Sequence, residues 1–159
     1  MSFATAYIGL GANLGNAQCT LIEAIDALRN TSGIHTVDSS KFWRSDPVDA
    51  PGPAYVNAAA KLSTTLAPLP LLRVLNTIEA EFGRERHFRN APRTLDLDLL
   101  LYDALSFSTP SLTVPHPRMH LRAFVLKPLI ELGAADTLVN GKPLKQWLAH
   151  CEEQPCSPL

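Results

Sequence analysis

Leucine and aspartate alternate over one short stretch of the chain, and this pattern constrains the fold more than any other feature. Leucines occupy positions 95, 97, 99 and 101, and Asp96 and Asp98 lie between them. A period of two is typical of a β-strand whose two faces differ in polarity. We therefore expect a strand that buries these leucines on one face. Both aspartates would lie on the other face, followed by Leu100 and Tyr102 further along it.

The two aspartates of this strand form a candidate metal site. On one face of a strand they would lie roughly 6–7 Å apart along the chain. Like charges at this spacing repel each other, and a cation between them would remove that cost. Oxygen ligands suit Mg²⁺, which usually completes its coordination shell with water and substrate phosphates. The spacing alone is equally compatible with an edge strand that has a solvated acidic face.

Length and composition set broad limits on the protein. A chain of 159 residues can bury one substantial core, so we expect residues 1–159 to form a single domain. The formal net charge of −1 and the lack of a long apolar run predict neither a nucleic-acid partner nor a membrane association. The first residues lack the basic start of a signal peptide, and the three cysteines lack metal-ligand spacing. These features indicate a cytoplasmic protein with free thiols.

Hydrophobic periodicity predicts the other elements of the chain. Strands are expected over residues 4–10, 34–44 and 55–62, and a short amphipathic segment over 143–150. Helices are expected from residue 17, with Asn16 as N-cap and Gly33 as the stop, from Pro68 to a stop at Gly83, and over 123–132. Glycines 9, 11 and 15 lack the spacing of a phosphate-binding loop. We expect them instead to form a tight turn whose backbone approaches a ligand.

A cluster of arginines precedes the leucine–aspartate strand. Four of the residues 84–93 are arginine, in a chain otherwise poor in charge. Guanidinium groups bind phosphate oxygens in a planar fork. Arginines beside a carboxylate pair that holds Mg²⁺ are the recurring arrangement of phosphoryl transfer. The alternative is a solvated basic loop that pairs with Glu79, Asp96 and Asp98.

Polar residues elsewhere add to the candidate site. Tyr55 and Asn57 share one face of the expected strand 55–62. A buried asparagine needs hydrogen-bond partners, which either a purine- or pterin-like heterocycle or a neighbouring loop backbone would supply. His116 and His120 are four residues apart, but a proline on each side of His116 prevents the helix that a zinc pair requires. An ordered loop that holds His116 and Arg122 near phosphates fits better.

Five blocks of sequence, taken together, resemble one known family. The blocks are Gly11-Ala-Asn13-Leu, Tyr55-Val-Asn57-Ala-Ala, Ile78-Glu79 with Gly83-Arg84-x-Arg86, Pro92-Arg93-Thr94-Leu95-Asp96-Leu97-Asp98, and Val114-Pro115-His116 with Arg122-x-Phe124. Over about residues 6–132 the chain resembles the 6-hydroxymethyl-7,8-dihydropterin pyrophosphokinases. The fourth and fifth blocks together are the most specific part of the match.

The resemblance implies a fold and an activity. The fold would be α/β (α+β) and ferredoxin-like, a single domain whose helices pack mainly on one face of a central antiparallel sheet. The activity would be transfer of pyrophosphate from ATP to the hydroxymethyl group of 6-hydroxymethyl-7,8-dihydropterin, with release of AMP, in folate biosynthesis. The cofactor would be two Mg²⁺ ions bound with ATP. The partners would be ATP and the pterin, and we expect a monomer or at most a weak dimer.

The resemblance also implies a role for individual residues. The catalytic residues would be Arg84, Arg93 and Asp98, and the metal ligands Asp96 and Asp98. The nucleotide-binding residues would be Glu79, Arg86, Arg93, Leu99, Thr113, His116 and Arg122. The pterin-binding residues would be Ser45, Pro47, Val48, Tyr55, Asn57 and Phe124. Among these, Asn57 would read the edge of the heterocycle, and Phe124 would stack on it.

The arginine-rich loop departs from some members of this family. They carry Arg-Trp-Gly where this chain has Arg89-Asn90-Ala91, and the loop here is one residue shorter. A tryptophan that stacks on the pterin from this loop has no counterpart in this chain. We expect altered affinity or loop dynamics rather than a lost reaction.

Two other classes of function compete with an enzyme. One is a binding module, either a small-molecule sensor without turnover or an RNA-binding domain. RNA recognition would require exposed aromatic residues and a basic face, but the aromatic content is 7% and only one basic cluster is present. The other is an inert structural domain, in which an arginine loop beside paired acids has no purpose. The presence of Asp96 and Asp98 together with Arg84 and Arg93 argues against the sensor, because a protein that only binds its ligand needs no two-metal geometry.

Overall fold

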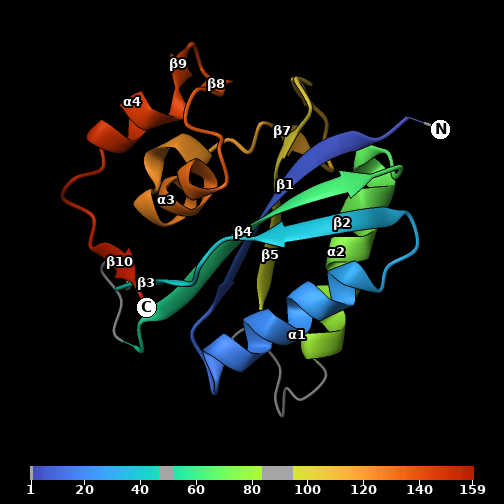
Figure 1. Cartoon of the computed structure of the whole chain (residues 1–159), viewed down its shortest axis with the longest axis horizontal. Coiled ribbons are helices and arrows are strands. Elements are labelled where there is room, and N and C mark those ends of the chain that lie inside the picture. Colours follow the sequence, from blue (N-terminus) through green and yellow to red (C-terminus); the bar gives the residue numbers. More distant parts are fainter. Residues whose placement is uncertain (1, 47–51, 84–94) are drawn as a thin grey trace.

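The computed structural model describes residues 2–46, 52–83 and 95–159, and these form a layered α/β fold around one antiparallel sheet (Figure 1). The strands of this sheet are β1 (Ala4–Ala12), β2 (Ile34–Ser39), β3 (Trp43–Ser45), β4 (Tyr55–Thr64), β5 (Asp96–Tyr102) and β10 (Cys156–Pro158). Their order is β10-β3-β4-β1-β5, and β2 pairs with the far end of β4. The predicted ferredoxin-like α/β class with a central antiparallel sheet is confirmed.

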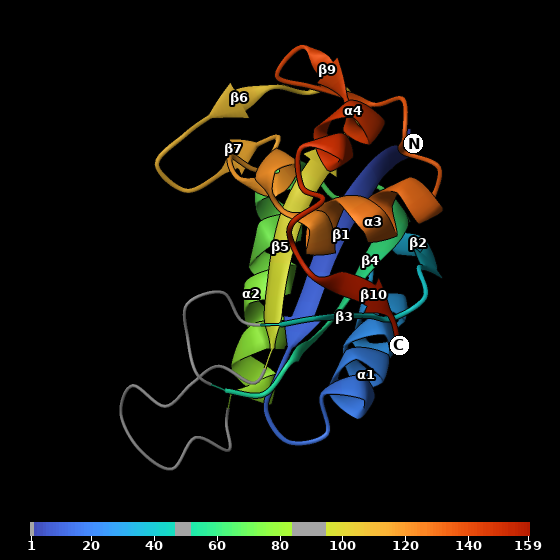
Figure 2. The ribbon, with the colours of Figure 1, turned by 90° about the vertical axis from the view of Figure 1, so that its left-hand side faces the viewer.

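Helices cover the two faces of the sheet unequally (Figure 2). The longer pair, α1 (Ala17–Arg29) and α2 (Pro68–Phe82), lies on one face. The shorter pair, α3 (Ala123–Glu131) and α4 (Leu144–Ala149), covers part of the other face. Apolar side chains fill both layers, so the sheet separates two cores. The part of the opposite face that α3 and α4 leave uncovered contains the cavity described below.

Short elements complete the described chain. They are β6 (Phe107–Ser108) paired with β7 (Thr113–Val114), a 3-10 turn η1 (Met119–Leu121), and β8 (Leu138–Val139) paired with β9 (Lys142–Pro143). No helix in the described ranges has the length and apolar character needed to cross a bilayer.

Strand β5 carries the alternating leucines and aspartates, but the alternation breaks near its end. The first three leucines of the run pack into the core beneath α1 and α2, as expected. A register shift against β1 then places Leu100 and Leu101 together in the core under α3 and α4. Tyr102 faces the α1–α2 side instead, where its hydroxyl donates to the Leu66 carbonyl at 2.5 Å. The predicted faces of Leu101 and Tyr102 are therefore wrong, because a β-bulge adds one residue and reverses the alternation.

The single strand expected over residues 34–44 is two strands, β2 and β3. Ser40 separates them: its backbone N–H donates to the Ala59 carbonyl and its hydroxyl accepts from the Ala59 N–H, both at 2.9 Å. Because these two bonds satisfy the Ala59 backbone, the chain can bend and rejoin β4 in a new register. Ser45 consequently pairs with Tyr55 at the start of β4.

The central strand β1 extends to Ala12, beyond the predicted end at residue 10. Gly9 and Gly11 consequently lie inside the sheet and not in the expected turn. Gly15 forms that turn with φ of 58°, a left-handed conformation that glycine adopts without strain. Two positions without side chains therefore lie in the middle of the sheet, where the site forms.

The ends of the two long helices agree only partly with the prediction. Helix α2 ends before Gly83, its predicted stop. Helix α1 ends at Arg29 with Asn30 as C-cap, so the predicted stop at Gly33 is wrong. Gly33 has φ of 92° and belongs to the turn that leads into β2.

Asn16 caps α1 as predicted, since its Oδ1 accepts a hydrogen bond from the Cys19 N–H at 3.1 Å. We expect Asn16→Ala to lower the free energy of unfolding by about 1 kcal/mol, because one N–H of the first turn loses its acceptor. Urea denaturation measures this difference. Asn16→Asp keeps an acceptor oxygen and should lose much less; equal losses in both variants would contradict the capping bond.

Candidate functional site

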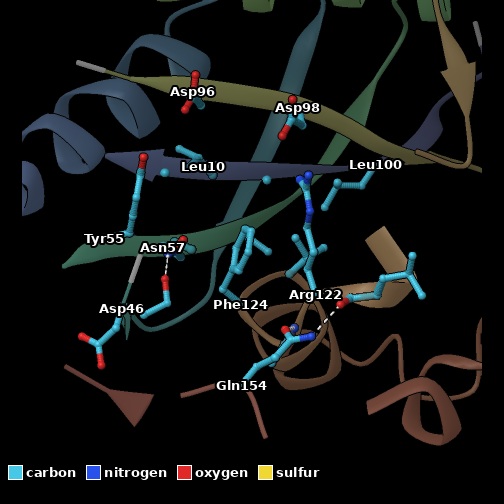
Figure 3. A pocket seen from close by; sticks show the side chains of 18 of the residues that line it. Leu10, Asp46, Tyr55, Asn57, Asp96, Asp98, Leu100, Arg122, Phe124 and Gln154 are labelled. Carbon is cyan, nitrogen blue, oxygen red and sulfur yellow. Dashed lines mark hydrogen bonds between the residues drawn. The ribbon is translucent and has the colours of Figure 1, made fainter. Parts of the chain in front are cut away.

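Three neighbouring strands form the floor of a cavity of about 560 Å³ (Figure 3). Strand β1 lies in the middle, with β5 on one side and β4 on the other. The register places Gly9 beside Asp98, and Gly11 between Asp96 and Asn57. A Cβ at Gly9 would lie 3.3 Å from the Leu100 side chain. The two glycines thus leave the centre of the floor free of side chains.

One side of the cavity is acidic. Asp96 and Asp98 both line it, and Figure 3 shows the two side chains on β5 above the central strand. Asp96 is exposed and Asp98 is half-buried. The prediction that the two carboxylates share one face is confirmed. This face opens into the cavity, so the strand is not simply an edge strand with a solvated acidic face.

The opposite side of the floor carries a buried amide. Asn57 on β4 is 3% exposed, and its Nδ2 donates to Ser45 Oγ at 3.0 Å. Tyr55 lies two residues before it and lines the same cavity. Among the described residues, Asn57 makes no other side-chain hydrogen bond, which leaves its Oδ1 and one N–H for a ligand. Ser45 thus orients the amide but uses only one of its hydrogen-bonding groups.

The start of α3 forms the third wall. Arg122 and Phe124 line the cavity, and the Arg122 guanidinium carbon lies 5.6 Å from the centre of the Phe124 ring. Figure 3 shows both side chains extending from α3 toward the strands that form the floor. A cation over an aromatic face is attracted by the ring quadrupole, so each side chain restrains the other. This wall combines a positive charge with a flat apolar surface.

His116 does not line this cavity, but the charges of two lining residues, Asp98 and Arg122, affect its pKa. Its backbone N–H donates to the Leu100 carbonyl at 2.9 Å, and its Nδ1 accepts from the Arg118 N–H at 3.2 Å. Burial lowers the pKa of His116, the Asp98 charge opposes this, and the Arg122 and Arg118 charges reinforce it. A neutral ring that accepts at Nδ1 carries its hydrogen on Nε2, which is then a donor.

We expect NMR to find His116 neutral at pH 7 with the hydrogen on Nε2. Because Asp98 raises the pKa of His116, Asp98→Ala should lower that pKa further in the ligand-free protein. The lowered pKa of His116 also makes the stability of the fold depend on pH. The unfolded chain takes up the proton at the ordinary histidine pKa, above the folded value, so His116 lowers stability as the pH falls through that range. A rise of this pKa in the variant would contradict the electrostatic influence of Asp98 on His116.

Besides His116, three more residues predicted to bind the nucleotide lie outside the cavity lining. Glu79 in the last turn of α2 accepts the Leu97 N–H at 2.9 Å and so fixes the start of β5. Leu99 is 2% exposed and packs toward α1 and α2, so only its backbone could meet a ligand. Thr113 shares a hydrogen bond with the Ser108 hydroxyl at 3.0 Å. Their direct roles stay predictions.

Several predicted site residues lie outside the described ranges. They are Pro47, Val48, Arg84, Arg86 and Arg93. These predictions stand as they were made from the sequence.

The structure gives two of the glycines named in the sequence another role and adds one site residue, Gln154, that no sequence pattern marked. Gly9 and Gly11 are two apart on one strand, a spacing that would have signalled a strand face without side chains. Gln154 lines the cavity from the C-terminal tail, together with the following residue, Pro155. No local pattern marks Gln154, because its position depends on how the tail folds back onto α3.

The chemistry of the acidic side fits a magnesium ion. Within the described ranges no group of three or more histidine, cysteine, aspartate or glutamate side chains gathers into a metal site. Asp96 and Asp98 supply hard oxygen ligands at the edge of an open cavity. Mg²⁺ typically takes one or two carboxylates and completes its shell with phosphate oxygens and water. The donor set therefore suits Mg²⁺ that arrives with a phosphorylated ligand.

Comparison with known proteins places these features in a family. Residues 7–134 match the family model described as 7,8-dihydro-6-hydroxymethylpterin-pyrophosphokinase. The chain is 43% identical over 146 residues to 2-amino-4-hydroxy-6-hydroxymethyldihydropteridine pyrophosphokinase of Pseudomonas aeruginosa, covering 91% of this chain and 90% of the relative. It is 45% identical over 151 residues to the protein of the same name from Haemophilus influenzae, covering 92% and 94%.

Solved structures show the same fold at low sequence identity. An HPPK-DHPS structure in complex with substrates superposes with a TM-score of 0.75 at 10% identity, covering 96% of this chain and 44% of that chain. Wild-type HPPK-DHPS of Plasmodium falciparum gives a TM-score of 0.69 at 12% identity, covering 94% and 41%. The present chain thus spans less than half the length of these two-part proteins.

Proposed function

The chain belongs to the 7,8-dihydro-6-hydroxymethylpterin-pyrophosphokinase family, and we propose that it transfers the β,γ-pyrophosphoryl group of ATP to 6-hydroxymethyl-7,8-dihydropterin, releasing AMP. One observation within the fold carries this proposal. Across the central strand, a carboxylate pair on β5 and a buried amide on β4 face the same cavity. The first suits a metal–phosphate group and the second a polar heterocycle, so both substrates would meet above Gly9 and Gly11.

The amide side would bind the pterin. A pterin ring presents hydrogen-bond donors and acceptors along one edge, and a carboxamide is complementary because it offers both. Ser45 holds the Asn57 amide in one orientation through the 3.0 Å bond. Phe124 would stack on the ring, and Tyr55 would close its end. Pro47 and Val48 complete the proposed pterin set.

The acidic side would bind the nucleotide phosphates. Asp96 and Asp98 would hold two Mg²⁺ ions together with ATP. When bound, these ions would neutralise phosphate charge and orient the reacting oxygens. Arg84 and Arg93 would stabilise the charge that develops on the transferred group. The remaining proposed nucleotide set is Glu79, Arg86, Leu99, Thr113, His116 and Arg122.

The reaction requires positioning more than a strong nucleophile. The hydroxymethyl oxygen of the pterin attacks the β-phosphorus of ATP, and the bond from that phosphorus to the bridging oxygen of the α-phosphate breaks, which leaves AMP. The hydroxyl proton passes to a carboxylate of the acidic pair or to water. Such a transfer is accelerated by holding both substrates in line and by stabilising charge. The two sides of the cavity belong to one rigid sheet and would hold the two substrates in line.

We propose further that residues 1–159 are one pyrophosphokinase domain that works in the cytoplasm as a monomer or at most a weak dimer. Its partners would be ATP and the pterin, without nucleic acid or membrane. The two bacterial relatives support the single domain, because this chain covers 90% and 94% of their lengths.

AMP release from ATP and Mg²⁺, with and without 6-hydroxymethyl-7,8-dihydropterin, tests the proposal. Pterin-dependent AMP, equal in amount to the pterin consumed, is the expected result. ADP in place of AMP would mean γ-phosphoryl transfer and would overturn the proposed chemistry. Binding of ATP or pterin without a nucleotide product would instead favour a sensor. ATP alone is the control, since water can compete with the pterin as acceptor.

A further inference from the structure

The C-terminal tail returns across the molecule to the edge of the site. After α4 the chain runs back past α3 and adds β10 to β3, as Figures 1 and 2 show. Cys156 of β10 pairs with Ser45, which orients Asn57. The Lys127 ammonium donates to the Cys156 carbonyl, and the Leu159 N–H donates to the Phe42 carbonyl at 3.0 Å. These bonds fix the tail against both α3 and β3.

Gln154 lies in this tail, at the wall of the cavity. Its Oε1 accepts from the Ala123 N–H, and its Nε2 donates to the Leu121 carbonyl, each at 2.8 Å. The two bonded groups belong to the residues immediately before and after Arg122. The backbone N–H of Gln154 donates to the Cys151 carbonyl at 3.0 Å, which anchors the turn that presents the side chain.

The start of α3 needs such a partner. The first N–H groups of a helix have no acceptor within the helix. Arg122 is the N-cap residue of α3, with φ of −125° and ψ of 114°, and its side chain makes no capping hydrogen bond. The Gln154 amide supplies the acceptor from a distant part of the chain. The Arg122 side chain has only donors and could not cap these N–H groups itself; it extends into the cavity (Figure 3).

We propose that Gln154 is a positioning residue of the active site. By holding the backbone on both sides of Arg122, it would fix where the Arg122 guanidinium and the Phe124 ring point. The inference rests on the proposed function, because it assigns to Arg122 the binding of nucleotide phosphates. Gln154 itself need not touch either substrate.

A double-mutant cycle tests this role, with kcat/KM for ATP measured at saturating pterin in four proteins. The proteins are the wild type, Gln154→Ala, Arg122→Met and the double variant. Arg122→Met removes the charge but keeps an unbranched side chain on Phe124. We expect Gln154→Ala to lower kcat/KM roughly five- to tenfold in the wild-type background and less than about twofold in the Arg122→Met background. Most of the loss should appear in KM for ATP.

Two further variants separate positioning from stability. Gln154→Glu keeps an acceptor for the Ala123 N–H but loses the donor to Leu121, so it should recover part of the lost kcat/KM. The matched control is Glu153→Ala, an exposed neighbour whose side chain makes no hydrogen bond or ion pair with the described part of the chain; it should behave as the wild type. Melting temperatures measured alongside report any general loss of fold.

The outcomes distinguish this inference from the proposed function. Wild-type protein that forms no pterin-dependent AMP would count against the function itself. Normal wild-type turnover with an unaffected Gln154→Ala variant would overturn the role of Gln154 alone. If Gln154→Ala lowered kcat/KM by the same factor in the wild-type and Arg122→Met backgrounds, the role would also be overturned, because Gln154 would then not act through Arg122.

Discussion

Asp98→Ala is expected to lower kcat/KM by roughly 10³-fold or more and to leave the fold intact. Asp98 is half-buried at the acidic side of the cavity, and its carboxylate makes no hydrogen bond or ion pair with the described residues. Its removal therefore breaks no structural contact, and it relieves repulsion from Asp96 two residues away. The melting temperature without ligands should be unchanged or slightly higher. Pterin-dependent AMP formation and thermal unfolding measure the two effects.

Two companion variants sharpen this test. Asp98→Asn keeps the size of the side chain but loses its charge, so it should be nearly as inactive as alanine if the carboxylate is a metal ligand. Asp38→Ala removes an exposed strand carboxylate far along the sheet on β2 and should change neither activity nor stability. Near-normal turnover in both Asp98 variants would show that the metal assignment is wrong. Inactivity accompanied by a large fall in melting temperature would assign Asp98 to the fold instead.

Local sequence patterns predicted those parts of the site that depend on neighbouring residues. The alternation around Asp96 and Asp98 determines which face of β5 carries the carboxylates, and the register with β1 then brings that face to the cavity. Asn57 follows the same logic on β4. Each of these predictions needs only the period of two and the existence of a partner strand.

Features that depend on distant contacts could not be predicted in this way. A bulge arises where β5 shifts its register on β1, and it places Leu101 and Tyr102 each on the face opposite to the predicted one. The sequence of the strand looks regular there. Strand β10 forms only because the tail crosses α3 and pairs with the edge of β3. Gln154 contributes to the site through that crossing, so its hydrogen bonds span more than thirty positions of sequence. Such contacts have no local signal for a single sequence to reveal.

Asn57→Ala is expected to raise the Kd for 6-hydroxymethyl-7,8-dihydropterin by roughly 10²-fold and to change the Kd for an ATP analogue much less. A site built to hydrogen-bond a heterocycle loses most when its own polar group is removed, since the edge of the ligand is left unpaired. Alanine also leaves a small gap at a position that is 3% exposed and removes the partner of Ser45 Oγ. We therefore expect a stability loss of about 1–2 kcal/mol in the same variant.

Asn57→Asp separates recognition from packing. The side chain keeps its size, and the Ser45 hydroxyl can rotate to donate to the new carboxylate, so the contact within the fold survives. The variant has no N–H to offer an acceptor on the pterin, and its pterin affinity should fall as far as in Asn57→Ala. Asn76→Ala, an exposed asparagine on α2, is the matched control and should bind both ligands normally. Calorimetric titration of each variant with pterin and with a non-hydrolysable ATP analogue decides the matter. If Asn57→Asp bound the pterin as tightly as the wild type, the amide would serve only to hold Ser45, and the heterocycle would have to be recognised by other groups of the cavity.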